Sequence, residues 1–198
     1  MSVLHVGVIS VFFACTLSFT WALLSFFRAL EKPPLGLRLI QITGLIFTLL
    51  HAWFLCRPGQ VEGIFGLMGL GVYGVSFVLF WSAIRANYQN PLSLAFNTDQ
   101  PQHLTSHGPY RCVRHPFYSS YLLSWSAGVV ASKQLLLFPT LAIMLAIYYV
   151  AATMEERKFF DSPLASDYQR YRTHTGMFWP RLCFKNSRKQ SIDETFLG

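Results

Sequence analysis

The residues best suited to chemistry lie in two clusters that flank apolar segments. The first is the run from Ser106 to Tyr118, which holds a Gly-Pro turn, two arginines, a histidine before a proline, and two tyrosines. The second is the acidic pair Glu155-Glu156 at the end of the last apolar segment. Charged side chains are costly near hydrocarbon, so such groups at the mouth of a helical bundle are typical of a site that binds a charged ligand.

Two prolines give the first cluster its expected shape. Gly108-Pro109 predicts a turn, because proline fixes φ and glycine accepts unusual backbone angles. Pro116 suits the first position of a helix, where the missing N–H costs no hydrogen bond. We therefore expect a helix that begins near His115-Pro116 and directs free N–H groups and its positive dipole end toward an anion.

The acidic pair needs a partner, because acids at a helix C-terminus oppose the macrodipole. The candidate partners are Arg111, Arg114, Arg157 and a cationic ligand. A simpler alternative is that the pair marks the end of a membrane span in solvent.

The elements that position these clusters are predicted to be membrane-spanning helices. Of the 198 residues 53% are hydrophobic and only 13% are charged, which exceeds what a soluble domain of this size can bury. The predicted fold class is an all-α, polytopic integral membrane bundle of about five spans, with a cytoplasmic C-terminal catalytic region. The windows of suitable length are residues 3–27, 37–55, 63–84, 118–131 and 135–153. The fourth is too short to cross ~30 Å of hydrocarbon unless its helix begins near Pro116 or forms a re-entrant hairpin with the fifth.

The basic residues predict the orientation of this bundle. With five spans, all of the 16 Lys and Arg except Arg57 and Lys133 lie on one side. The positive-inside rule then places the N-terminus outside and the motif loop and C-terminus in the cytoplasm. We attribute the net charge of +7 to membrane-surface electrostatics and expect no nucleic-acid partner, because no basic stripe is interleaved with base-stacking aromatic residues.

The chain divides into three predicted regions. Residues 1–84 form a three-helix transmembrane region, in which Gly66, Gly69, Gly71 and Gly74 are expected to let helices approach closely. Residues 85–184 form the cofactor-binding and catalytic region, which includes a short amphipathic helix after Ser162-Pro163 as a candidate lid. Residues 185–198 form a polar tail that is predicted to be disordered.

The motifs taken together resemble the catalytic half of the isoprenylcysteine carboxyl methyltransferase family and its phospholipid methyltransferase relatives. The resemblance covers about residues 95 to 182 and rests on the order of Gly108-Pro109-Tyr110-Arg111, Arg114-His115-Pro116-x-Tyr118, Glu155-Glu156 and Thr175-x-x-Phe178-Trp179-Pro180. It implies methyl transfer from S-adenosylmethionine, at the cytoplasmic membrane face, to a lipophilic or prenylated acceptor that stays in the lipid. The cofactor-binding residues that it implies are Gln102, His103, Leu104, Thr105, Tyr110, His115, Pro116, Phe117, Tyr118 and Glu155.

The residue types suit this cofactor. His115 and the N–H groups after Pro116 can bind its carboxylate, and Glu155 can bind its ammonium group or ribose hydroxyls. The rings of Tyr110 and Tyr118 can face adenine or the sulfonium. The candidate catalytic residues are Arg114, as a cation toward the acceptor, and Glu156, as a proton acceptor. No metal is expected, because positioning and desolvation supply most of the acceleration of such a displacement.

Two positions depart from the family pattern. Gln102 stands where a histidine usually opens the cofactor segment, and Ala151 stands where the prenylcysteine enzymes place an arginine that engages the substrate carboxylate. We therefore expect a lipid amine, thiol or hydroxyl as the acceptor if no other arginine substitutes. On this interpretation, Ala151→Arg is expected to improve the turnover of a prenylcysteine analogue.

Other functions fit the sequence less well. An NADPH-dependent membrane reductase of the steroid-reductase type shares the polytopic architecture, and a non-catalytic scaffold could retain the same fold. A di-metal desaturase needs many more histidines than the six of this chain. The expected location is the plasma membrane of a bacterium or the endoplasmic reticulum of a eukaryote, and the oligomeric state is left open.

Overall fold

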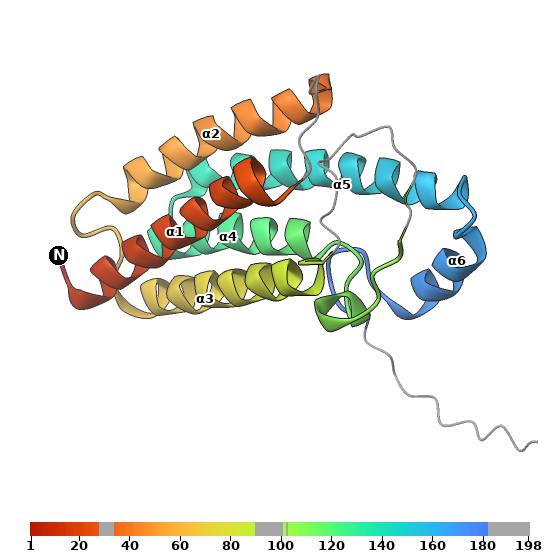
Figure 1. Ribbon diagram of the computed structural model, residues 1–198. Helices are drawn as coiled ribbons and strands as arrows, with labels where there is room; N and C mark the ends of the chain where they lie inside the picture. The colour runs from red at the N-terminus through yellow and green to blue at the C-terminus, as the bar shows by residue number, and fades with distance from the viewer. Residues whose placement is uncertain (28–33, 90–100, 102, 182–198) are drawn as a thin grey trace, which may run out of the picture.

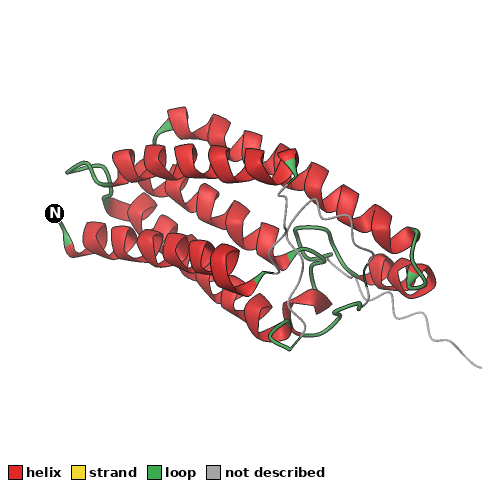
Figure 2. Cartoon of the chain, turned by 45° about the horizontal axis from the view of Figure 1, so that its top comes forward, coloured by secondary structure: helices red, strands yellow, loops and turns green. Residues whose placement is uncertain are grey.

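The structure is a computed structural model that describes residues 1–27, 34–89, 101 and 103–181 (Figure 1). Figure 2 shows helices joined by loops, with no strand in this described part of the chain. The helices are α1 (Val3–Trp21), which continues into the π-helical turn η1 (Ala22–Phe26), then α2 (Leu35–Leu55), α3 (Gly63–Ala86), the 3-10 turn η2 (Gly108–Arg111), α4 (Pro116–Ser132), the 3-10 turn η3 (Leu135–Leu137), α5 (Phe138–Phe160) and α6 (Ala165–His174). The predicted all-α bundle is confirmed.

Four helices are long and apolar enough to cross a membrane by length and composition: Val3–Phe26, Leu35–Leu55, Gly63–Ala86 and Leu135–Phe160. The protein is an integral membrane protein. The fourth predicted span corresponds to α4, which has 17 residues. Its helix begins at Pro116, which is one of the two arrangements that the short window allowed. It is only about 25 Å long, and it packs between α3 and α5 within the bundle (Figure 1).

Small residues decide how closely α3 and α4 approach. A Cβ added to Gly69 would lie 2.5 Å from the Cβ of Ala131, so only glycine fits this contact. Gly66 is similarly confined by Leu4 and Val61, each 3.1 Å from the position of an added Cβ. For Gly71 and Gly74 the expected close approach is wrong, because an added Cβ would meet nothing within 4 Å.

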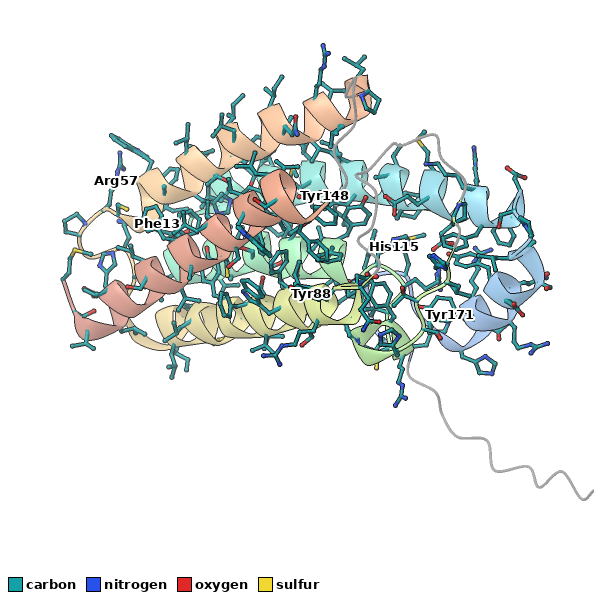
Figure 3. All side chains as sticks on the ribbon, viewed as in Figure 1. Phe13, Arg57, Tyr88, His115, Tyr148 and Tyr171 are labelled. Atoms are coloured by element: carbon teal, nitrogen blue, oxygen red, sulfur yellow. The ribbon has the colours of Figure 1, made fainter. Side chains whose placement is uncertain are left out.

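The helices α1 to α5 alternate in direction, so the end of α3, the start of α4 and the end of α5 meet at one end of the bundle (Figure 1). We call this the site end. The N-terminus lies at the opposite end, and Figure 3 places His115 and Tyr171 at the site end and Arg57 at the other. Segments that are far apart in the sequence are thereby brought together around His115.

Candidate active site

The two sequence motifs at the site end are joined by backbone hydrogen bonds. The N–H of Arg114 donates to Gly176 O over 2.8 Å, and the N–H of His115 donates to Met177 O over 3.1 Å. Gly176 N–H donates in turn to Cys112 O over 3.1 Å, and Val113 and Gly176 form a parallel bridge. A Cβ at Gly176 would lie 1.7 Å from Trp179 O, so this turn requires glycine. The segment after α6 therefore fixes the backbone that leads into α4.

Glu156 is the centre of a buried ionic network. Its Oε1 accepts from Arg114 Nε over 2.8 Å and from His115 Nε2 over 3.2 Å, and its Oε2 lies 3.5 Å from Arg172 Nε. Arg114 also donates to the carbonyl of Thr175. The side chain of Glu156 is only 5% exposed. The predicted partner Arg114 is thus confirmed, and the alternative that both acids end the span in solvent is wrong for Glu156.

Glu155 lies beside this network but has a different environment. It accepts from the Tyr118 hydroxyl and lies 3.5 Å from His115 Nδ1, and its side chain is 30% exposed. The rings of His115 and Tyr148 both stack with the Tyr118 ring, with centroids 5.6 Å and 5.2 Å from it. Glu155 therefore presents a carboxylate to open space from an aromatic wall.

His115 has partners that the sequence did not lead us to expect. Burial lowers the pKa of its imidazole, but hydrogen bonds and charge from Glu155 and Glu156 prevail, and its pKa is raised above 6.5. Its two ring nitrogens face these carboxylates, which favour the charged form of the ring. That His115 binds the carboxylate of a ligand stays a prediction, as it does for the N–H groups in the first turn of α4.

The segment before the turn is held by an asparagine that the sequence interpretation missed. Thr105 Oγ1 donates to Asn87 Oδ1 over 3.1 Å, and Asn87 Nδ2 donates to the Tyr110 hydroxyl over 2.9 Å. The Tyr171 hydroxyl donates to the Tyr110 carbonyl over 2.7 Å. Asn87 is fully buried at the end of α3, and an asparagine just after a long apolar helix was the available signal.

A continuous cavity of about 470 Å³ begins at these groups and runs into the membrane helices. Its polar end is lined by all the described residues predicted for the site except Glu156: His103, Leu104, Thr105, Tyr110, Arg114, His115, Pro116, Phe117, Tyr118 and Glu155. Gln102 lies outside the described residues. Tyr168 and Tyr171 of α6 also line this end, as expected of a lid helix, together with Phe159.

The other end of the cavity is largely apolar and is lined from α1, α2, α4 and α5. Its walls include Phe12, Phe19, Leu23, Leu37, Ile40, Gly44, Leu45, Tyr121, Trp125 and Tyr148. His51 also lines this end, and its Nε2 lies 2.9 Å from Thr140 Oγ1. In the described part of the chain, no group of three His, Cys, Asp or Glu side chains could hold a metal ion.

The phospholipid methyltransferase family model matches residues 64–165, which is more than half of the chain. This chain belongs to that family. Its members are integral membrane methyltransferases related to the isoprenylcysteine carboxyl methyltransferases, so the protein is a membrane methyltransferase. The match spans α3 to α5, including η2 and both carboxylates. A comparison with curated proteins finds no significant match.

Two positions singled out in the sequence of this methyltransferase do not line the cavity. Glu156 does not line the cavity and three basic side chains surround it, and its expected role as a proton acceptor stays a prediction. Ala151 is fully buried and also does not line the cavity. An arginine at this buried position would need a partner for its charge, and the expected gain in turnover of a prenylcysteine analogue in Ala151→Arg stays a prediction.

Proposed function

We propose that this methyltransferase transfers the methyl group of S-adenosylmethionine to an uncharged nucleophile, an amine above all, of a membrane lipid. The observation that carries the proposal is the continuity of the cavity. One end has carboxylate, N–H donors and aromatic rings, and the other lies among membrane helices and is mostly apolar. A small polar ligand and a lipid can thus meet inside one enclosure.

The polar end has the donors and acceptors that this cofactor requires. Glu155 is the exposed carboxylate for the ammonium group or ribose hydroxyls, and the first-turn N–H groups of α4 suit the carboxylate. The rings of Tyr118 and Tyr110 offer faces for a sulfonium or for adenine. When bound, S-adenosylmethionine supplies an electrophilic methyl group.

The acceptor end favours a neutral nucleophile over a carboxylate. Arg114 is the only Arg or Lys among the described residues that line the cavity, and Glu156 and the Thr175 carbonyl already engage it. A substrate carboxylate would therefore lack an orienting cation. A low-dielectric cavity also lowers the pKa of an amine and favours its neutral form, whose lone pair can form the new C–N bond as the C–S bond breaks. The product ammonium then releases its proton to solvent.

The chain's own residues position this reaction and exclude water from it. The stacked rings of His115, Tyr118 and Tyr148 form part of the wall of the cavity. Arg114, Glu156 and Arg172 hold α4, α5 and α6 together behind that wall. Since the cofactor is water-soluble and the basic residues gather at the site end, we assign this end to the cytoplasmic face.

Two measurements test the proposal. Saturating S-adenosylhomocysteine should raise the melting temperature of the purified protein by mass action, and NADPH should not. The protein should then transfer label from methyl-labelled S-adenosylmethionine to phosphatidylethanolamine in vesicles, and much more slowly to a prenylcysteine analogue. Stabilisation by NADPH alone would favour the reductase, and stabilisation by neither ligand would favour the scaffold. Faster labelling of the prenylcysteine carboxylate would overturn the choice of acceptor.

A further inference from the structure

A second depression, a groove of about 900 Å³, lies on the outer face of α3 and shares no lining residue with the methyl-transfer cavity. Its membrane part is formed by Gly71, Gly74, Val75 and Val78. Its other end is formed by Arg85 and by the turn that begins at His107. Apolar surface therefore ends at basic groups, at the site end of the bundle.

The membrane part has the shape and polarity of a binding surface for a hydrocarbon chain. The absence of a Cβ at Gly71 and Gly74 leaves a depression, because nothing lies within 4 Å of either missing Cβ. Val75 is 58% exposed and Val78 is 65% exposed along the same face. Ser82 adds no free donor, because its hydroxyl donates to Val78 O over 2.7 Å.

The length of the groove matches one leaflet. Gly71 and Arg85 are 14 positions apart on one helix, which corresponds to about 21 Å. Half of a ~30 Å hydrocarbon core is about 15 Å, and the headgroup layer adds several more. A chain that lies along Gly71 to Leu79 would therefore bring its phosphate to the level of Arg85.

The charge at that level selects the headgroup. Arg85 and His107 are both exposed, and no carboxylate among the described residues lies within 4 Å of Arg85. Each cation near a membrane surface adds about 1 kcal/mol of attraction to an anionic lipid. We propose that this groove binds one anionic phospholipid of the leaflet at the site end, with its chain along α3 and its phosphate at Arg85 and His107.

A lipid in the groove touches the same turn that forms the wall of the methyl-transfer cavity. Gly108 and Pro109 line the groove, and the next residue, Tyr110, lines the cavity. Gly108 has φ +59°, and an added Cβ would lie 3.4 Å from Ala86, so η2 sits directly against the end of α3. The bound headgroup thus stabilises η2 without occupying the site of methyl transfer.

The experiment compares dioleoylphosphatidylglycerol with dioleoylphosphatidylcholine by native mass spectrometry of the full-length protein in detergent. The wild type should bind the anionic lipid at least about fivefold more tightly, and the double variant R85Q/H107Q should lose most of that preference. The variant G74L, which fills the groove, should weaken binding of both lipids. The variant K133Q removes a cation at the opposite end and should bind as the wild type does.

Melting temperature and size-exclusion profile show whether each variant is folded, independently of methyl transfer. An undiminished preference for the anionic lipid in R85Q/H107Q would refute the site, and equal binding of both lipids by the wild type would refute its charge selectivity. A wild-type dimer that becomes a monomer in G74L would instead identify the groove as an interface between two copies of this chain.

Discussion

The two ends of the methyl-transfer cavity are built in different ways. At the polar end, charged groups from distant parts of the sequence are tied together, because the buried Glu156 contacts the buried Arg114 and the half-exposed Arg172. At the apolar end, α1 and α2 contribute mainly ring and aliphatic side chains. Charge-assisted hydrogen bonds fix geometry, whereas apolar walls tolerate variation in shape. On the proposed function, a cofactor of constant structure and a more variable lipid would be recognised by different interactions within one cavity.

Two buried histidines illustrate the contrast. His115 lies between two carboxylates, which favour its charged form. His51, in the membrane part, has a single partner, Thr140, whose hydroxyl already donates to Leu137 O and so accepts from His51 Nε2–H. The Nδ1 of His51 lies against Gly128, where an added Cβ would be only 2.2 Å away. One histidine organises charges, and the other fills space between helices.

The largest expected effect is a loss of stability when Glu156 is removed, which distinguishes this acid from its neighbour Glu155. Glu156→Ala should lower the free energy of unfolding by about 3–5 kcal/mol, because Arg114 is left buried and unpaired. Denaturation in detergent measures the loss. The control is Asp161→Ala, which removes an exposed acid just after α5 and should cost less than about 0.5 kcal/mol. Equal stability of both variants would show that the network is not structural.

The next effect is on cofactor binding and should appear at the other acid. Glu155→Gln retains an acceptor for Tyr118 but loses the charge, so affinity for S-adenosylhomocysteine should fall by about 1–3 kcal/mol. Isothermal titration calorimetry measures this, and the free energy of unfolding should stay within about 1 kcal/mol of wild type. Unchanged affinity would place the ammonium or ribose group away from Glu155.

The apolar end should respond to added bulk without any change at the polar end. Gly44 of α2 lines the cavity and has open space around its missing Cβ, so Gly44→Leu fills the acceptor region without a clash. We expect kcat/KM for the lipid to fall about tenfold and the Kd of S-adenosylhomocysteine to change less than about twofold. Ile46→Phe adds bulk on the exposed side of α2 and is the matched control. If Gly44→Leu weakens the binding of S-adenosylhomocysteine as much as it lowers kcat/KM for the lipid, the two ends of the cavity are not separate.

The smallest effect is a pH dependence of stability that comes from His115. Because its folded-state pKa is raised above 6.5, its contribution is fully present below about pH 6.5 and is lost as the pH rises through the folded-state value. The melting temperature of the wild type should therefore exceed that of His115→Gln most at about pH 5.5 and least at about pH 9. A difference that stays constant over this range would mean that the pKa of His115 is the same in the folded and unfolded states.

The sequence by itself determined the helical membrane architecture and most of the cavity's polar wall. Hydrophobic windows set the spans because hydrocarbon thickness dictates helix length, and Pro116 marked the start of α4 because proline is accepted there. The order of the segments also predicted that Tyr110, Tyr118 and Glu155 lie at one end of the bundle, because helices of alternating direction return the chain to the same end.

Only the tertiary structure decided how these groups divide their roles. Glu155 and Glu156 are equivalent as neighbours in sequence, but successive positions on a helix point about 100° apart, so one faces the cavity and the other faces Arg114 and Arg172. The surroundings of Asn87 and Gly71 could likewise not be predicted from the sequence. Whether Asn87 contacts Tyr110, and whether Gly71 faces open space, depends on how the helices pack. Local sequence patterns specify which groups reach the end of the bundle, whereas packing between distant segments specifies what each group contacts.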